Sequence, residues 1–155
     1  RLIDGSIKEC LTLHMPSATD ADILQATKAS GAYDFITQLP EGFDTQVGEA
    51  GNVFSSGQIK RIALAQVLIK NTPVLLLDEP TSDIDKPTEQ HLLRTLCELS
   101  KTRTIIIVTH STAILQSADG IVLMENSQVV GAGPGEQLRP KLGLASEKVL
   151  PGAAS

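Results

Sequence analysis

Two short apolar runs in the middle of the chain constrain the fold more than any other feature of the sequence. The first is Val74–Leu77, and the second is Ile105–Val108 within a predicted strand over Thr104–Thr109. Continuous aliphatic runs of this length are typical of parallel strands that are covered on both faces. Helices are predicted on either side of the first run, over Ile59–Lys70 and Pro87–Ser100, from the helical spacing of apolar residues and from their caps. Strands that alternate with helices predict an α/β layered fold.

The other elements are predicted from capping and turn residues. Residues 1–57 are expected to be mostly helical, with a helix from Thr19 or Asp20 to Ser30, a shorter helix over Tyr33–Gln38 and a turn-rich connector over Leu39–Asp44. After the second strand we expect a short helix over Ser111–Ser117 and a hairpin formed by Ile121–Met124 and Gln128–Val130. The segment after Gly131 is rich in Gly, Pro and Ala, and its end is expected to fray.

The composition limits the kinds of function that the chain can have. It has 155 residues, of which 41% are hydrophobic and 20% are charged, and its formal net charge is −5. This length predicts one domain, and the negative charge argues against a nucleic-acid or anionic-membrane surface held by bulk charge. The apolar runs are too short to span a bilayer. Because the chain starts at Arg1 without a signal-peptide pattern, we interpret it as an excised fragment. Cys10 and Cys97 fit a reducing compartment and are interpreted as small buried hydrophobes.

Polar residues with catalytic potential follow both apolar strands. Asp78 and Glu79 come directly after the first strand, and His110 follows the second. In a parallel α/β sheet ligands gather at the carboxyl ends of the strands, where these three side chains are expected to lie. Phosphoryl transfer needs a metal holder and a group that orients the attacking water. Taken singly, each residue also has a purely structural explanation, as a loop cap or as a histidine that completes a hydrogen-bond network.

The segment Phe54-Ser55-Ser56-Gly57-Gln58 is predicted to be a capped helix start, and its spacing from the strands is informative. Gln58 precedes Asp78 by 20 residues, which leaves room for one helix, a turn and one strand. His110 follows Glu79 by 31 residues, which is enough for one more helix and strand. The three segments together therefore carry far more information than any of them alone.

In combination these segments resemble the nucleotide-binding domain of ATP-binding-cassette (ABC) proteins. The matching motifs of that family are the signature at 54–58, the Walker B motif at Val74–Pro80 and the switch histidine at 110. Ser82-Asp83-Ile84-Asp85 is similar to the D-loop, and Leu39–Glu49 is similar to a run found before the signature in exporters. Asp4–Ile7 looks like the segment just after the Q-loop, so the resemblance covers about residues 2 to 140.

The resemblance implies an incomplete P-loop NTPase fold of the RecA-like type with a helical subdomain. Residues 1–57 would be the helical signature subdomain, residues 58–140 the RecA-like α/β portion with Walker B and the switch histidine, and residues 141–155 a flexible tail. The sequence contains no Gly-x-x-x-x-Gly-Lys-Ser/Thr loop to cradle phosphates. We therefore expect the parent protein to hydrolyse ATP and the chain alone to be inactive. Without a neighbouring Walker A strand, the apolar strands would have an open edge or an uncovered face that could recruit other chains.

The resemblance also implies a role for each candidate residue. Asp78 would hold Mg²⁺, Glu79 would be the general base for the attacking water, and His110 would contact the γ-phosphate of ATP. The signature residues and two D-loop residues would complete an ATP site whose Walker A loop belongs to a second nucleotide-binding domain in a head-to-tail dimer; they are Phe54, Ser55, Ser56, Gly57, Gln58, Ser82 and Asp85. The signature differs from the usual Leu-Ser-Gly-Gly-Gln at Phe54 and Ser56, which is either harmless drift or a weakened composite site.

The class of ABC protein is suggested by two segments. Leu39–Glu49 favours an exporter that is joined to a transmembrane domain, at the cytoplasmic face of the inner membrane and without a nucleic-acid partner. Asp78–Ser82 looks more like exporters of the type 1 secretion kind than like multidrug exporters. One alternative is a degenerate ABC-like module for dimerisation or regulation, against which the intact Glu79 and His110 argue. Another is a soluble ATPase of the DNA-maintenance kind, against which the lack of a heptad run in residues 1–54 argues. The transported substrate is not specified by the sequence.

Overall fold

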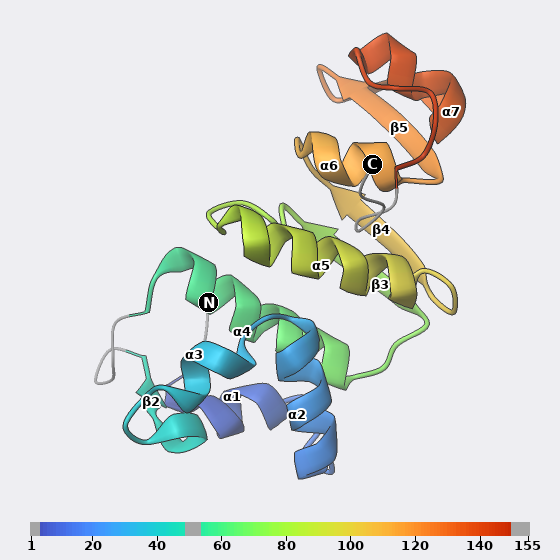
Figure 1. The fold of residues 1–155 in the computed structure, drawn as a ribbon. Coiled ribbons are helices and arrows are strands. Elements are labelled where there is room, and N and C mark those ends of the chain that lie inside the picture. The colour runs from blue at the N-terminus through green and yellow to red at the C-terminus, as the bar shows by residue number, and fades with distance from the viewer. Residues whose placement is uncertain (1–3, 49–53, 150–155) are drawn as a thin grey trace.

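The computed structural model describes residues 4–48 and 54–149 of the chain. The amino-terminal part consists of short helices and one small antiparallel strand pair (Figure 1). Its elements are β1 (Gly5–Ser6), α1 (Ile7–Thr12), α2 (Asp20–Ala29), α3 (Tyr33–Thr37), the 3-10 turn η1 (Gly42–Asp44) and β2 (Gln46–Val47), which pairs with β1. A capping box between Thr19 and Asp22 starts α2. The helices predicted after Thr19 and from Tyr33 are confirmed, and each ends one residue earlier than expected.

The middle of the chain is a β-α-β unit that follows a long helix. Its elements are α4 (Ser56–Ile69), β3 (Val74–Asp78), α5 (Lys86–Leu99) and β4 (Thr104–Val108). β3 and β4 are parallel neighbours, in register from Val74 opposite Thr104 to Asp78 opposite Val108. The two predicted strands and the two predicted helices are therefore confirmed. The helix predicted over Ile59–Lys70 starts three residues earlier, at Ser56, because the side chain of Ser55 caps it within the predicted helix start at 54–58.

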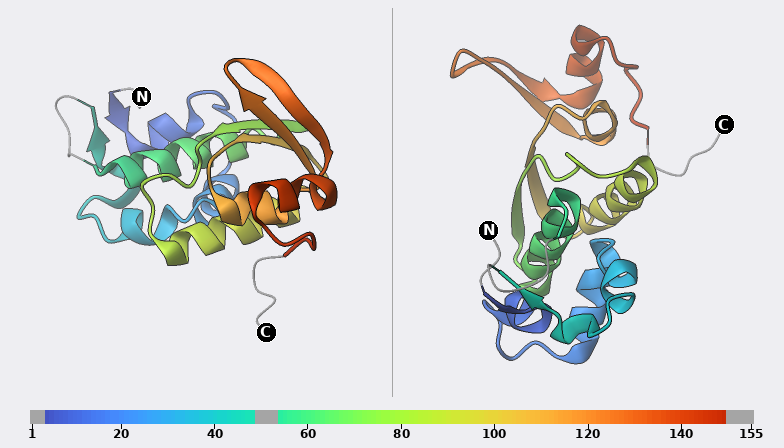
Figure 2. Two further views of the ribbon diagram at one scale, coloured as in Figure 1. Left: turned by 90° about the horizontal axis from the view of Figure 1, so that it is seen from above. Right: turned by 90° about the vertical axis from the view of Figure 1, so that its left-hand side faces the viewer.

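Only one face of the β3–β4 sheet is covered by the described part of the chain. Leu75 and Leu77 join the core built by α1, α2, α4 and α5, and Leu75 is only 1% exposed. Leu76, between them, is 71% exposed, and Val74, Ile106 and Val108 are also exposed. In the right-hand view of Figure 2, α4 and α5 both lie on one side of the strands. The expectation that both faces are covered is wrong for the described residues, whereas the expected uncovered face is confirmed.

Side chains of α5 hold the carboxyl-terminal end of α2. The hydroxyl of Thr95 donates to the carbonyl oxygen of Ala29 at 3.1 Å. A ring nitrogen of His91 lies 2.8 Å from the carbonyl oxygen of Lys28. The last carbonyl groups of a helix have no intrahelical donor, so these contacts satisfy them. One cluster of buried side chains accordingly includes residues from the amino-terminal helices and from the β-α-β unit. The division of the chain at residues 57 and 58 stays a prediction.

The carboxyl-terminal part is a hairpin that short helices flank. Its elements are α6 (Thr112–Ser117), β5 (Gly120–Glu125), β6 (Gln128–Pro134), α7 (Gly135–Leu138) and the 3-10 turn η2 (Arg139–Leu142). The hairpin is confirmed, but β6 continues to Pro134 instead of ending at Val130. The buried Arg139 donates from Nη1 to the carbonyl of Ala118 at 2.8 Å and from Nε to the carbonyl of Ser146 at 3.1 Å. Through the carbonyl group of Ser146, residues 141–149 are therefore hydrogen-bonded to the part of the chain that contains the hairpin and its flanking helices.

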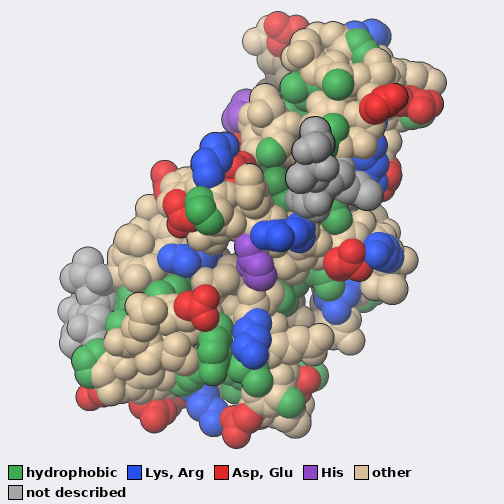
Figure 3. Space-filling view, in the orientation of Figure 1, with side chains coloured by type: hydrophobic (Ala, Val, Ile, Leu, Met, Phe, Trp, Pro, Cys, Tyr) green, Lys and Arg blue, Asp and Glu red, His purple; other side chains and the backbone are tan. Residues whose placement is uncertain are grey.

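The surface of the molecule carries charges of both signs. Acidic and basic side chains are interspersed over the face shown in Figure 3, where neither sign forms a continuous patch. Within residues 4–48 and 54–149, no helix combines the length and the apolar character that a membrane crossing requires.

Candidate functional site

The carboxylate of Glu79 meets the backbone of His110 at the carboxyl end of the β3–β4 sheet. The N–H of Glu79 donates to the carbonyl oxygen of Val108 at 2.9 Å, which extends the strand pairing by one residue. Oε1 of Glu79 accepts a hydrogen bond from the N–H of His110 at 3.1 Å. The hydroxyl of Thr109 donates to Oε2 of Glu79 at 3.4 Å. The parallel register thus brings together two residues that the sequence placed at this edge of the sheet.

The imidazole of His110 stands free of the protein surface. Its side chain is 100% exposed, and its Nε2 lies 3.8 Å from Oε1 of Glu79. This separation is too long for a hydrogen bond, so the ring is oriented by the backbone bond and by its own rotamer. A ring held in this way can contact a ligand that arrives at the end of the sheet.

The backbone at Glu79 adopts a conformation that side chains other than glycine rarely accept. Its φ is +44°, in the left-handed region, which costs about 1–3 kcal/mol for such a residue. The turn is fixed by Ser82, whose N–H and hydroxyl donate to the carbonyl oxygen of Glu79 at 3.2 Å and 2.9 Å. The surrounding hydrogen bonds therefore hold Glu79 in a strained turn while its side chain reaches the loop after β4.

Asp78, the last residue of β3, has an exposed side chain. Within the part of the chain that the structure describes, its carboxylate has no hydrogen-bond or ion-pair partner. Among those residues, no group of three or more His, Cys, Asp or Glu side chains could hold a metal ion. Mg²⁺ is commonly bound by one or two carboxylates together with water and substrate phosphates. Asp78 therefore fits Mg²⁺ as a single protein ligand beside a phosphate group.

The predicted helix start at 54–58 is the start of α4. The hydroxyl of Ser55 accepts from the N–H of Gln58 at 3.2 Å, and Oε1 of Gln58 accepts from the N–H of Ser55 at 2.9 Å. This capping box occupies the backbone N–H groups of both residues. The N–H groups of Ser56 and Gly57 have no acceptor among the described residues. The helix start therefore offers two donors and the positive end of a helix dipole to an anion.

The start of α4 is bound to the loop that follows β3. Gly57 is buried, and a Cβ atom there would stand 2.6 Å from the carbonyl oxygen of Asp83. One turn further along, Nζ of Lys60 donates to the carbonyl oxygen of Ser82 at 3.2 Å and pairs with Oδ2 of Asp83 at 2.9 Å. Lys60 also contacts the hydroxyl of Ser82. Packing within the chain is thus sufficient to explain the glycine at position 57.

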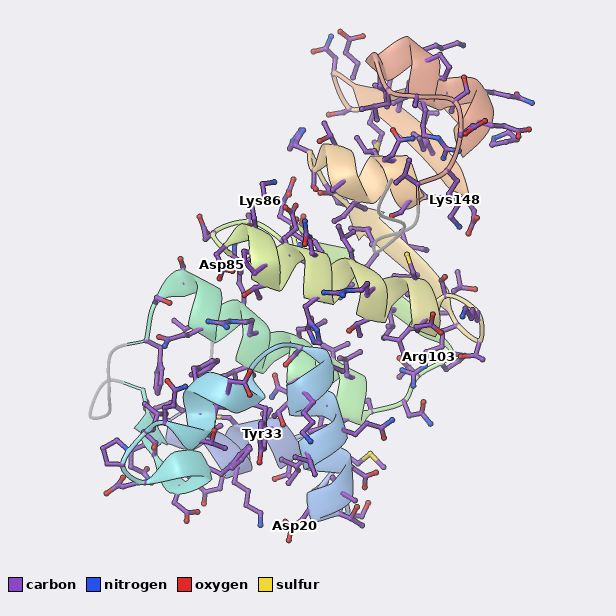
Figure 4. The ribbon with its side chains drawn as sticks, viewed as in Figure 1. Asp20, Tyr33, Asp85, Lys86, Arg103 and Lys148 are labelled. Carbon is purple, nitrogen blue, oxygen red and sulfur yellow. The ribbon has the colours of Figure 1, made fainter. Side chains whose placement is uncertain are left out.

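The remaining candidates, Phe54 and Asp85, both have structural contacts. The rings of Phe54 and Phe35 pack with their centroids 6.5 Å apart. Asp85 caps α5, because its Oδ1 accepts from the N–H of Thr88 at 3.0 Å. The backbone and hydroxyl hydrogen bonds from Thr88 hold the pKa of the Asp85 carboxyl below its ordinary value. Asp85 and Lys86 lie together at the amino-terminal end of α5 (Figure 4).

Comparisons with known proteins place this geometry in a family. Residues 7–82 match the family model described as ABC transporter. A protein of Staphylococcus aureus strain NCTC 8325, described as a multidrug export ATP-binding/permease protein, is 41% identical over 92% of this chain. The solved structure of a bacterial Atm1-family ABC exporter with ATP bound superimposes with a TM-score of 0.82 at 33% identity, over 99% of this chain. This chain belongs to the ABC transporter family.

The chain corresponds to only a part of these ABC proteins. It spans about a quarter of the length of the relatives that it matches, 25% of the Staphylococcus aureus protein and 27% of the solved exporter chain. A second Staphylococcus aureus relative, from the bovine strain RF122, is 40% identical with the same coverage. The β3–β4 unit with α4 and α5 is accordingly a portion of the P-loop NTPase fold of the ABC ATP-binding domain.

Two residues that support this ABC domain were missed by the sequence analysis. Lys60 joins the start of α4 to the loop after β3 through Ser82 and Asp83. Glu89 of α5 accepts a hydrogen bond from the hydroxyl of Ser111 at 2.9 Å, next to His110 in the sequence. An acidic residue early in a helix is usually explained by the helix dipole, so the sequence offered no signal that pointed Glu89 at Ser111.

Proposed function

We propose that the complete protein containing this chain is an ABC exporter that couples ATP hydrolysis to transport across a membrane. The observation that carries the proposal is the hydrogen bond from the N–H of His110 to the carboxylate of Glu79, at the ends of adjacent parallel strands. That arrangement fixes a carboxylate base beside an exposed imidazole, as water activation next to a phosphoryl group requires.

Each residue at the end of the sheet has a separate task. Glu79 orients the attacking water and accepts its proton, and its two bonds to the loop after β4 hold the carboxylate in place. The exposed ring of His110 donates a hydrogen bond to an oxygen of the γ-phosphate. Asp78 would hold Mg²⁺, which neutralises charge on the phosphates when it is bound.

The signature and D-loop act on a nucleotide that a second copy of the domain holds. The N–H groups of Ser56 and Gly57 at the start of α4 are directed at its γ-phosphate, as helix amino termini favour anions. Ser82 and Asp85 lie in the loop bound to that helix start through Lys60. The two domains would therefore form a head-to-tail dimer with ATP between them.

The relatives support a membrane exporter as the setting of this reaction. The Staphylococcus aureus protein is described as ATP-binding and permease together, and the solved relative as an exporter of the Atm1 family. We infer that a transmembrane domain is the partner of this chain at the cytoplasmic face of the membrane. The type 1 secretion class suggested by Asp78–Ser82 stays a prediction.

Substitutions at the end of the sheet test the proposal. In the complete protein, Glu79→Gln should lower ATP turnover by about 100-fold or more while ATP still binds, because the amide keeps the shape and loses the basicity. Glu98→Gln on the exposed side of α5 is the matched control and should leave turnover unchanged. Near-normal turnover in Glu79→Gln would remove Glu79 from the role. A complete protein that dimerises without hydrolysing ATP would instead support the alternative function, a degenerate ABC-like module for dimerisation or regulation.

A further inference from the structure

Glu89 is an acidic side chain that the chemistry described so far does not use, although it is buried. It lies in the first turns of α5 and is 8% exposed. Oε1 accepts from the hydroxyl of Ser111 at 2.9 Å, and Oε2 accepts from Nζ of Lys86 at 2.8 Å. A carboxylate that leaves water must be compensated by hydrogen bonds, and Glu89 has one on each oxygen.

The bond to Ser111 reaches the residue that directly follows the switch histidine. The N–H of Ser111 donates to the hydroxyl oxygen of Thr109 at 2.9 Å, so residues 109 and 111 are tied across His110. Glu79 holds the same loop from the other side, through the N–H of His110 and the hydroxyl of Thr109. Two carboxylates from different elements thus clamp three consecutive residues.

This clamp matters because no side chain in the described ranges forms a hydrogen bond with the ring of His110. Its side chain is 100% exposed, and the nearest ion-pair distance, to Glu79, is 3.8 Å. The place of the ring in space is therefore set by the backbone of residues 109–111. A group that moves this backbone moves the imidazole with it.

We propose that Glu89 is a positioning residue for the switch histidine, acting through the hydroxyl of Ser111. The inference rests on the proposed function, since it assigns Glu89 to the same phosphoryl-transfer site. It also connects two parts of that site, because Asp85 of the D-loop caps the helix on which Glu89 lies, one turn away. Displacement of the D-loop by a partner domain is thereby transmitted to His110 through the first turns of α5.

The alternative is that Glu89 only stabilises α5 through its ion pair with Lys86. In that pair the Lys86 side chain is 84% exposed and only Glu89 is buried, so water screens the ammonium and weakens the ion pair. Glu98, near the end of the same helix, forms a pair with the same spacing to Lys101, which follows the helix; the two charged groups are 2.6 Å apart and both side chains are exposed. This second pair is a matched control for the structural role.

A double-mutant cycle in the complete protein tests the proposal. Glu89→Ala should lower kcat for ATP hydrolysis by about 10- to 100-fold, as a misplaced catalytic group does, with the KM for ATP changed by less than about twofold. Ser111→Ala should have the same effect, and the double variant should be no slower than either single variant. Glu89→Gln, which keeps an acceptor for the hydroxyl, should restore most of the rate. Lys86→Met and Glu98→Ala should both hydrolyse ATP at the normal rate.

The possible results separate this inference from the function on which it depends. Normal kcat in Glu89→Ala or Ser111→Ala, or additive losses in the double variant, would overturn the positioning role while Glu79→Gln and His110→Ala remain inactive. Full activity in His110→Ala would instead overturn the proposed function itself. If Glu89→Ala does not fold, Ser111→Ala and Glu89→Gln decide the matter, because Ser111 lies outside α5, where it caps α6, and glutamine keeps the size of the Glu89 side chain.

Discussion

A Cβ atom at Gly57 would stand 2.6 Å from the carbonyl oxygen of Asp83, so the first turn of α4 lies directly against the loop that follows β3. Lys60 bonds to the same loop, which makes the helix start and the loop one packed unit. Since both segments are proposed to meet the nucleotide of a partner domain, they would approach it together.

This contact reverses the usual effect of replacing glycine in a helix. Alanine normally stabilises a helix by about 0.5–1 kcal/mol relative to glycine. Gly57→Ala should instead destabilise the chain by about 1–3 kcal/mol, because the added methyl group overpacks against the backbone at Asp83. Ser56→Ala, at the exposed neighbouring position, should change stability by less than about 0.5 kcal/mol. Urea unfolding followed by circular dichroism compares the two; a higher midpoint for Gly57→Ala would mean that the helix start and the loop do not pack as described.

The signature can be tested for action in trans at Ser55. Ser55→Arg in the complete protein should leave nucleotide binding intact but abolish ATP-dependent dimerisation, because the long side chain fills the space before the helix start. Ser55→Ala loses the same cap, at about 1 kcal/mol, without filling that space, and should still dimerise. Equilibrium nucleotide binding and sedimentation velocity are measured separately. If Ser55→Arg fails to bind ATP as a monomer, or dimerises and hydrolyses ATP normally, the assignment of the signature to residues 54–58 is wrong.

The chain by itself should not bind Mg-ATP with measurable affinity. It contains no Gly-rich phosphate loop, and Asp78 and Glu79 repel a triphosphate when no metal is bound. Isothermal titration calorimetry of the chain with Mg-ATP should therefore show no saturation at cellular nucleotide concentrations. A micromolar dissociation constant would mean that another segment of the chain cradles the phosphates.

Neighbouring leucines of β3 should respond oppositely to truncation. Leu75→Ala should destabilise the chain by about 2–5 kcal/mol, since Leu75 is 1% exposed and the substitution leaves a cavity. Leu76→Ala should change stability by less than about 0.5 kcal/mol, because Leu76 is 71% exposed. The two substitutions are the same and lie at adjacent positions. The difference between their losses of stability in chemical denaturation therefore measures the effect of the sheet face on which the leucine lies. Equal losses would show that the outer face of the sheet is covered in solution.

Acid should weaken the attachment of the loop at residues 109–111. Hydrogen bonds from Lys86 and Ser111 hold the pKa of Glu89 below its usual value of 4.5. A carboxyl whose pKa is lowered by folding stabilises the protein above its unfolded pKa, and this stabilisation is lost as the pH falls through the folded pKa. The urea midpoint should thus fall less steeply below pH 4.5 in Glu89→Gln than in the unmodified chain. Parallel curves would exclude Glu89 as a source of the acid sensitivity.

The elements and their caps could be predicted because their causes are local in the sequence. The apolar runs gave β3 and β4, and Ser55 and Asp85 each cap a helix through an N–H three residues later. The contact between Glu79 and His110 was also predictable, since parallel strands bring their carboxyl ends together.

The sequence did not predict which face of the β3–β4 sheet is buried, or which residues far apart in the sequence are in contact. A run of four apolar residues has no alternation, so nothing in it distinguished buried Leu75 from exposed Leu76. Glu89 and Ser111 are 22 residues apart, and their hydrogen bond depends on how α5 packs against the start of α6. The Gly- and Pro-rich composition after Gly131 concealed the end of β6, where pairing with β5 decides the backbone conformation.

Across the described residues the strands form three separate pairs, with no strand shared between them. The backbone ladder of β3–β4 therefore does not continue into the β5–β6 hairpin, and cooperativity between the two must pass through side-chain packing. Units joined in this way open sub-globally, each with its own free energy. Residues 109–119, which include α6, join these units covalently, so hydrogen exchange in the hairpin would report openings that reach the loop around His110.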